Sequence, residues 1–408
     1  MTYLIKAPAQ IKGSIKLPAS KSISNRLLII KALSSNNIDI SNLSEAQDTK
    51  TLEALLASTE ETLDCGHAGT AMRFLTAYLS TLNRTAVLTG SDRMLQRPIG
   101  VLAESLKQMG VDITYLGETG YPPLQIKGGG IEKAEVTIDS TVSSQFISAL
   151  MLIGPTLPNG LTIHLTENVV SQAYLEMTLK TIKHFGIKAK RLPNLIVIEP
   201  GEYKEGALTV EADWSAASYW YSMVAMSEDA EIELLGLGKD SWQGDSIISE
   251  LFTLLGVKTK YTENGVVLKK YSVYAKELGY DFINCPDLVQ TMCVTTSALG
   301  IPTRYSGLET LKIKETDRVD ALKSELQKVG VDIEELKVGE ITSFPPELSD
   351  DGKTIISTFE DHRMAMAFTP LACMFGQISI ANPEVVQKSY PNFWDDLKSV
   401  GFTIEEIG

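Results

Sequence analysis

Short stretches in which apolar and polar residues alternate are followed along the chain by longer stretches with helical spacing. Residues 9–17 alternate in this way and end at Pro18, which predicts a strand, and residues 27–33 form an apolar helical run. The same succession returns many times. Strands that alternate with helices are typical of an α/β fold.

A further helix is predicted over residues 319–329, where apolar side chains recur every three or four positions. Thr316 or Asp317 can cap its first turn, and Gly330 is expected to end it. Two cations and two carboxylates stand at its start, over residues 314–318. This start suits either a solvated turn whose charges pair among themselves, or a site that keeps an acid or base beside a bound anion.

One pattern repeats: an amphipathic helix, an apolar residue, a glycine, and an apolar residue that leads into a strand. The five glycines are Gly110, Gly186, Gly256, Gly330 and Gly401. They lie 76, 70, 74 and 71 residues apart. The helix predicted over residues 48–58 resembles a sixth, shortened copy, because no such glycine follows it. Six modules predict two domains of three modules each, with mixed sheets.

Cations gather at the predicted helix starts, where unpaired N–H groups and the positive end of the helix dipole attract anions. They are Lys21, Arg26, Arg97, Lys314, Arg318, Arg363 and Lys388. Their shared position predicts one cationic cleft between two domains. Cations that face each other across such a cleft repel, so we expect the protein to be open without ligands and closed with them.

Other helix starts add uncharged groups that suit a ligand. Gly69 has no side chain, so a ligand can approach the N–H groups of the helix that follows. The residues Ser143, Ser144 and Gln145 open a run over 146–152. Pro98 suits the first turn of another helix, and single helices are predicted over residues 288–299 and 364–375.

Composition narrows the class of protein. The chain has 408 residues, 44% of them hydrophobic, and a net charge of -14, which argues against nucleic acid or an anionic membrane as partner. Four cysteines and four histidines are scattered without metal-ligand or redox spacing. The longest apolar run, residues 364–375, is too short to span a bilayer. We expect a cytoplasmic protein in a reducing compartment.

Six motifs resemble the EPSP synthase (3-phosphoshikimate 1-carboxyvinyltransferase) family of enolpyruvyl transferases. They lie at residues 17–26, 68–73, 97–100, 143–145, 314–318 and 361–365. The resemblance implies a two-domain inside-out α/β barrel, each domain built from three βαβαββ units with mixed sheets. Residues 1–19 and 212–408 would form the domain with the acid and base residues and part of the phosphoenolpyruvate site, and residues 20–211 the domain with most of the shikimate 3-phosphate site.

The resemblance also implies a reaction. The enolpyruvyl group of phosphoenolpyruvate would pass to the 5-hydroxyl of shikimate 3-phosphate by addition and elimination, giving EPSP and phosphate in aromatic amino acid biosynthesis. No metal and no cofactor is implied, and we expect a monomer. Shikimate 3-phosphate would be held by Lys21, Ser22, Arg26, Ser143, Ser144, Gln145, Ser171, Asp287 and Lys314, with Tyr174 under its ring. Phosphoenolpyruvate would be held by Lys21, Gly69, Arg97, Gln145, Arg318, Arg363 and Lys388.

By the same resemblance, three residues would be catalytic. Asp287 would take the proton of the attacking hydroxyl. Glu315 would protonate the methylene carbon and later remove a proton from the methyl group. Lys21 would help phosphate to leave. Many cations of this kind suit two substrates that carry several negative charges.

Some positions depart from the family pattern. His67 and Thr310 stand where Asn is usual, Ala19 where Gly is usual, Phe74 where Pro is frequent, and Gln172 where Lys is frequent.

Two alternative functions stay open. The related UDP-N-acetylglucosamine enolpyruvyl transferases usually carry a Cys acid in the segment that matches residues 91–98, which has none here. A noncatalytic anion-binding protein of the same fold would gain by losing carboxylates near its anions.

Overall fold

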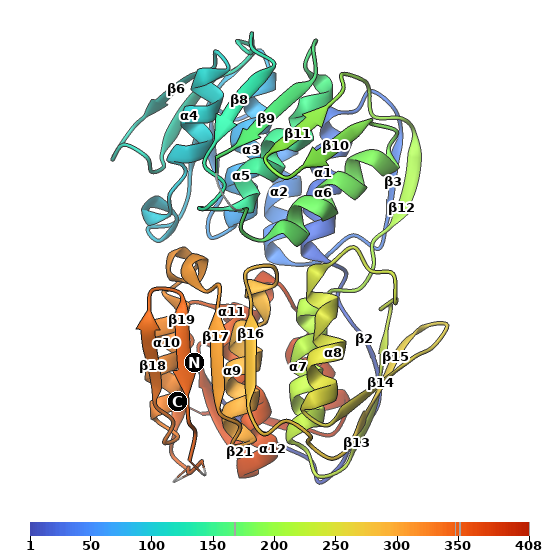
Figure 1. The fold of residues 1–408 in the computed structure, drawn as a ribbon, viewed down its shortest axis with the longest axis vertical. Coiled ribbons are helices and arrows are strands. Elements are labelled where there is room, and N and C mark those ends of the chain that lie inside the picture. The colour runs from blue at the N-terminus through green and yellow to red at the C-terminus, as the bar shows by residue number, and fades with distance from the viewer. Residues whose placement is uncertain (167–168, 347, 351, 408) are drawn as a thin grey trace. The chain divides into compact units, whose positions relative to one another are not determined.

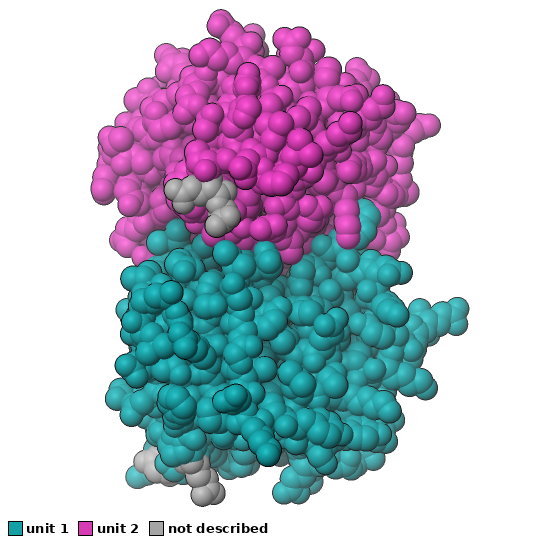
Figure 2. All heavy atoms as spheres, viewed as in Figure 1, with its two compact units in different colours: residues 1–19, 211–408 teal, residues 20–210 magenta. Residues whose placement is uncertain are grey.

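The computed structural model describes residues 1–166, 169–346, 348–350 and 352–407. The chain forms two compact units, shown in Figure 2. Unit 1 consists of residues 1–19 and 211–408, and unit 2 of residues 20–210. Ala19 and Ala212, near which the sequence predicts the chain to pass between domains, form an isolated antiparallel bridge.

Unit 1 contains three four-stranded sheets within the described residues. Their strands are β1 (Thr2–Lys6), β2 (Ile11–Lys16), β13 (Ala230–Leu235), β14 (Val257–Tyr261), β15 (Gly265–Lys270), β16 (Leu278–Asp281), β17 (Thr303–Ser306), β18 (Ile333–Lys337), β19 (Glu340–Ser343), β20 (Ile355–Ile356), β21 (Gln377–Ala381) and β22 (Thr403–Glu406). The strand orders are β14-β15-β13-β2, β16-β17-β19-β18 and β20-β21-β1-β22. Each sheet has one parallel pair and two antiparallel pairs, as in β2 parallel to β13, so the sheets are mixed as predicted.

Unit 2 has two sheets of the same design and one shorter sheet among its described residues. The strands are β3 (Ile38–Ser41), β4 (Thr62–Asp64), β5 (Thr85–Thr89), β6 (Asp112–Tyr115), β7 (Leu124–Lys127), β8 (Glu135–Ile138), β9 (Leu161–Leu165), β10 (Ala189–Leu192), β11 (Leu195–Ile198) and β12 (Gly206–Thr209). The orders are β4-β5-β7-β6, β10-β11-β9-β8 and β12-β3. The two-stranded sheet belongs to the shortened module, whose helix is α2 (Gln47–Ala57).

Three internal helices fill the middle of each unit. In unit 1 they are α7 (Trp214–Met226), α9 (Val289–Ala298) and α11 (His362–Phe368), and nearly every residue of each is buried. In unit 2 they are α1 (Lys21–Leu33), α3 (Gly69–Thr81) and α5 (Ser144–Ile153). Within each unit the three helices contact one another, with α7 beside α9 and α3 beside α5 (Figure 1). Helices that are apolar on all sides are expected in a core, and here the sheets enclose them.

The other helices are only partly buried, and five of them are followed by a predicted glycine. They are α4 (Gly100–Gln108), α6 (Gln172–His184), α8 (Ile248–Leu254), α10 (Arg318–Gln327), α12 (Ala372–Phe375) and α13 (Phe393–Ser399). After α4, α6, α8, α10 and α13 the repeat glycine adopts a φ between +83° and +109°. The N–H of Gly330 donates to Gln327 O and that of Val331 to Leu326 O, which is the Schellman helix end.

Short 3₁₀ turns also occur among the described residues. They are η1 (Met94–Gln96), η2 (Gly154–Thr156), η3 (Gly244–Ile247), η4 (Pro286–Leu288), η5 (Glu309–Ile313), η6 (Thr369–Leu371) and η7 (Pro383–Lys388). The single helix predicted over 364–375 was wrong, because Pro370 lacks an N–H and the chain passes through η6 there. Pro98 also lies before α4 instead of in its first turn, and Gly120 O accepts the N–H groups of Ile99 and Gly100.

Candidate active site

The helix starts of unit 2 carry one group of the predicted site residues. Lys21 is the first residue of α1, so this helix begins six residues earlier than the apolar run indicated. The Lys21 Nζ lies 2.9 Å from Asp48 Oδ2, and both side chains are largely buried. Asp48 comes from the start of α2 and was missed by the sequence analysis, because only the fold brings it to Lys21.

Arg26 lies deeper in α1 and is almost completely buried. Its guanidinium donates to Thr178 Oγ1 at 2.7 Å, to Ser22 O at 2.7 Å, and to Tyr174 O and Ser148 Oγ at 3.2 and 3.3 Å. Burial lowers the pKa of Arg26 to about 10, so it stays charged at neutral pH. These four bonds use four of its five N–H groups and tie Arg26 to Ser22 and Tyr174.

Gly69 and Arg97 meet at the start of α3. A Cβ placed on Gly69 would lie 2.8 Å from Arg97 Nη1, so the guanidinium occupies the space that any side chain at 69 would need. Buried Arg73, one turn later in α3, donates to Gly69 O and Pro98 O at 3.1 Å each. Arg73 therefore holds together the two segments that carry the predicted phosphoenolpyruvate contacts.

The start of α5 brings a row of hydroxyl and amide groups to the same helix bundle. Ser143 is the N-cap and accepts the N–H of Gln145, while the Gln145 Nε2 lies 3.5 Å from Thr70 Oγ1 on α3. Ser171 stands at the N-cap of α6 with a left-handed φ of 54°. A non-glycine residue in that conformation is uncommon and often marks a functional position.

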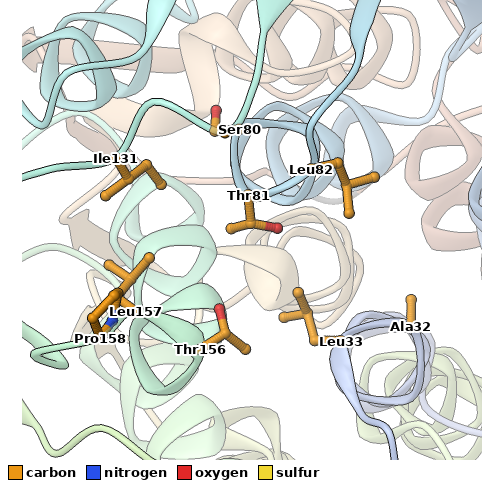
Figure 3. Close-up of a pocket in the computed structure, with 10 residues that line it drawn as sticks. Ala32, Leu33, Ser80, Thr81, Leu82, Ile131, Thr156, Leu157 and Pro158 are labelled. Atoms are coloured by element: carbon orange, nitrogen blue, oxygen red, sulfur yellow. The ribbon is translucent and has the colours of Figure 1, made fainter.

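A separate cavity in unit 2 lies at the opposite ends of these helices and does not suit an anion. A cavity of about 390 Å³ lies where α1 and α3 end, lined by Leu33, Thr81 and Thr156 among others (Figure 3). The hydroxyls of Ser80, Thr81 and Thr156 donate back to helix carbonyls. Helix C-termini carry the negative end of the dipole, so this cavity repels anions, whereas the N-termini with Lys21 and Gly69 attract them.

In unit 1 the predicted residues converge on Arg318. Arg318 is the first residue of α10 and is 2% exposed. Its Nε donates to Asp361 Oδ2 at 2.7 Å, its Nη1 to Asp287 Oδ1 at 3.1 Å, and its Nη2 to Glu315 Oε2 at 2.9 Å. Burial by itself lowers the pKa of Arg318, but the three carboxylates together raise it well above its ordinary value.

Two further cations complete this cluster. Arg363 Nη2 lies 2.6 Å from Asp287 Oδ2, and its Nη1 donates to Tyr219 Oη at 3.2 Å. Lys388 Nζ lies 2.8 Å from Glu315 Oε1. Each of the two predicted proton-transfer residues, Asp287 and Glu315, is thus held between two cations. We call Asp287, Glu315, Asp361, Arg318, Arg363 and Lys388 the unit 1 cluster.

Helix capping explains why the cluster forms. Asp317 caps α10 by accepting the N–H groups of Val319 and Asp320, which decides between the two predicted caps. Asp361 caps α11 through the N–H of Arg363 and pairs with Arg318. One carboxylate therefore fixes both a helix start and a buried guanidinium. Asp361 lies in one of the six motifs, but the sequence did not indicate its ion pair.

Two further residues named in the sequence analysis lie before α10 in the chain. Lys314 lies half-buried between η5 and α10, and Thr310 is buried within η5. The sequence analysis missed Tyr219 and Asp245, which lie in and near α7 and approach the cluster only through the fold. None of the helices in the described chain combines the length and the hydrophobicity that a bilayer crossing requires.

Comparison with known proteins indicates the family of the chain. The family model for EPSP synthase (3-phosphoshikimate 1-carboxyvinyltransferase) matches residues 5–59 and 52–397. The 3-phosphoshikimate 1-carboxyvinyltransferase of Bacteroides fragilis strain YCH46 is 48% identical over 407 residues, with 99% of each chain covered. That of Sulfurovum sp. strain NBC37-1 is 35% identical, with 97% of this chain and 98% of the relative covered.

A solved structure of EPSP synthase from Acinetobacter baumannii has the same fold, with a TM-score of 0.76, 21% identity and full coverage of both chains. The fold is the two-domain α/β architecture that the motifs implied. The chain therefore belongs to the EPSP synthase (3-phosphoshikimate 1-carboxyvinyltransferase) family of transferases.

Proposed function

We propose that the chain transfers the enolpyruvyl group of phosphoenolpyruvate to the 5-hydroxyl of shikimate 3-phosphate, and that the unit 1 cluster carries out the proton transfers. The observation that supports this most strongly is the position of Arg318, buried between Asp287, Glu315 and Asp361. Buried carboxylates repel a bound anion, so a protein that only bound anions would gain by having fewer of them in this network.

The two units contribute different groups to binding in this proposal. Arginine matches carboxylate and phosphate with two parallel hydrogen bonds, so Arg318, Arg363 and Arg97 hold phosphoenolpyruvate, with Lys388 beside them. The hydroxyl and amide groups at the starts of α1, α5 and α6 suit shikimate 3-phosphate. The complete list for that substrate is Lys21, Ser22, Arg26, Ser143, Ser144, Gln145, Ser171, Asp287 and Lys314. Residues 1–19 and 212–408 supply the acid and base, and residues 20–211 most of the acceptor site.

In the addition step, the 5-hydroxyl oxygen forms a bond to the central carbon of phosphoenolpyruvate. Asp287 accepts the hydroxyl proton, since Arg318 and Arg363 on its two oxygens keep it ionised and oriented. Glu315 delivers a proton to the methylene carbon. Substrate anions that draw Arg318 and Lys388 away from Glu315 remove the charges that oppose its protonation, which links proton uptake to substrate binding.

The elimination step reverses one of these transfers. Glu315 removes a proton from the new methyl group as the carbon–oxygen bond to phosphate breaks. Lys21 stabilises the departing phosphate, and its ion pair with Asp48 holds the ammonium group in place beforehand.

The four cysteines are free and largely buried thiols, which supports a reducing compartment. We extend the proposal to a cytoplasmic monomer, because every assigned group lies in one chain.

Phosphate release measured with two acceptors tests the function. We expect release from phosphoenolpyruvate with shikimate 3-phosphate and none with UDP-N-acetylglucosamine. Asp287→Asn and Glu315→Gln keep the shape of each side chain but remove its proton transfer, so each should lower kcat by roughly 10²-fold to 10⁴-fold. Shikimate 3-phosphate should still bind in calorimetry.

Glu405→Gln is the matched control, because Glu405 is a carboxylate whose ion pair with Lys6 lies on the surface. It should leave kcat unchanged. Near-normal turnover in Asp287→Asn or Glu315→Gln would remove that residue from its assigned role. Release with the amino-sugar nucleotide instead would overturn the choice of acceptor.

A further inference from the structure

A fourth carboxylate lies buried beside the unit 1 cluster, and the mechanism above does not use it. Asp245, at the start of η3, is 4% exposed. Its Oδ2 accepts a hydrogen bond from Ser215 Oγ in the first turn of α7. Within the described residues no Lys, Arg or His forms an ion pair with Asp245. A buried carboxylate whose hydrogen-bond partner is a neutral hydroxyl is costly in its ionised form.

Helix α7 connects Asp245 to the cluster. Ser215 and Tyr219 are four residues apart on α7 and therefore lie on one face of it. Ser215 holds Asp245, and Tyr219 accepts a hydrogen bond from Arg363, which in turn pairs with Asp287. The turns η3 and η4, which carry Asp245 and Asp287, both contact α7. The two carboxylates therefore lie on segments fixed by the same helix.

The charge count of the cluster shows why the state of Asp245 matters. Three cations, Arg318, Arg363 and Lys388, face three carboxylates, Asp287, Glu315 and Asp361. The cluster is thus balanced before any substrate arrives. An ionised Asp245 would make it net negative at the place where anionic phosphoenolpyruvate must bind.

We propose that Asp245 is a positioning residue of this enzyme, which holds a proton in the working state and so keeps the cluster able to accept an anionic substrate. The inference rests on the assignment of Asp287 and Arg363 to the site. Asp287 loses its negative charge when it takes the hydroxyl proton. A protonated Asp245 is neutral, so it does not compete with the substrate for Arg363.

The groups around Asp245 favour the protonated form. Burial and the charge of Asp287 raise the pKa of Asp245 to about 7, with a smaller contribution from Asp213 at the start of α7. Ser215 and Arg363 act in the opposite direction. The nearby thiol of Cys285 stays neutral, because burial and Asp245 raise its pKa far above the ordinary value. Of these two groups beside the unit 1 cluster, Asp245 is the one whose charge changes near neutral pH.

The test compares the KM for phosphoenolpyruvate at pH 6 and pH 8.5. In the unmodified enzyme, ionisation of Asp245 should contribute a roughly tenfold rise in KM over this interval, as expected for one extra charge near a bound anion. Asp245→Asn keeps the acceptor for Ser215 but carries no charge, so its ratio of KM at the two pH values should be about tenfold smaller. Titration of the substrate phosphates affects both proteins equally and cancels.

Ser215→Ala gives an independent shift in a known direction. Without the Ser215 hydroxyl, Asp245 holds its proton to higher pH, so the rise in KM should move to higher pH. Equal KM ratios in Asp245→Asn and the unmodified enzyme, together with an unmoved profile in Ser215→Ala, would overturn the proposal. The decrease in kcat predicted for Asp287→Asn tests the proposed function separately, because it does not depend on this pH profile.

Thermal unfolding gives a second measurement that does not need turnover. A carboxyl whose pKa is raised by folding binds more protons in the folded state, so its contribution to stability falls as pH rises from about 4 to about 7. The Tm of Asp245→Asn minus that of the unmodified protein should therefore increase between pH 5 and pH 7 and then level off. A difference that does not change with pH would mean that Asp245 is ionised throughout and would contradict the inference.

Discussion

At the residue scale, one buried guanidinium organises the acid and base groups of unit 1. Arg318 donates to three carboxylates from three different segments, those of Asp287, Glu315 and Asp361. Arginine can do this because its donors lie in a rigid planar fork, whereas lysine offers a single compact charge. The side chain type at 318 therefore matters beyond its charge.

We predict that Arg318→Lys lowers both stability and turnover. The shorter side chain cannot reach all three carboxylates, and underpaired buried charges should cost about 3–5 kcal/mol of unfolding free energy. The midpoint of urea unfolding and kcat measure the two effects. Arg304→Lys is the control, because Arg304 is 70% exposed and its ion pair with Glu340 should be worth at most about 1 kcal/mol. Similar losses in the two variants would refute the central role of Arg318.

At the element scale, the repeat glycines show how closely the pattern in the sequence follows backbone geometry. Each of the five repeat glycines follows a helix and adopts a positive φ, so the spacing near 70 residues marked real helix ends. The strand after each glycine forms the edge of a four-stranded sheet. Helix starts were harder to predict, as at Lys21, because polar residues can continue a helix when the fold buries them.

We predict that two equivalent glycine substitutions differ in cost. Gly330→Ala places its Cβ 3.7 Å from Ser349 Oγ, so the main penalty is the left-handed conformation, about 1–2 kcal/mol. Gly110→Ala suffers the same penalty and also brings its Cβ to 2.5 Å from Gly130 O. Its loss of unfolding free energy should be clearly larger. Equal losses in chemical denaturation would mean that the chain around Gly130 relaxes freely.

At the scale of the whole molecule, charge balance changes one expectation from the sequence. Cations at helix starts were expected to repel one another in the unliganded protein. In unit 1, however, carboxylates already neutralise Arg318, Arg363 and Lys388. In unit 2, Lys21 is paired with Asp48. Repulsion between cations is therefore weaker than the sequence suggested. We expect compaction mainly because the substrates bind residues of both units in our proposal.

Small-angle scattering can separate these two causes. We predict that the radius of gyration falls when phosphoenolpyruvate and shikimate 3-phosphate are both added, because residues of both units bind them in our proposal. Raising the salt concentration without substrates should leave the radius unchanged, since ion-paired cations gain little from screening. Compaction by salt alone would restore the repulsion mechanism, and no compaction with both substrates would argue against shared binding.

The sequence by itself determined the local features of this protein. The helix ends at the repeat glycines follow from interactions between residues close together in the chain, and the motifs were specific enough to indicate the family. Only the tertiary structure decided which charges meet. The pairs Lys21 with Asp48, Arg363 with Asp287 and Asp245 with Ser215 join residues 27 or more positions apart, and such long-range contacts depend on how the helices pack rather than on local sequence.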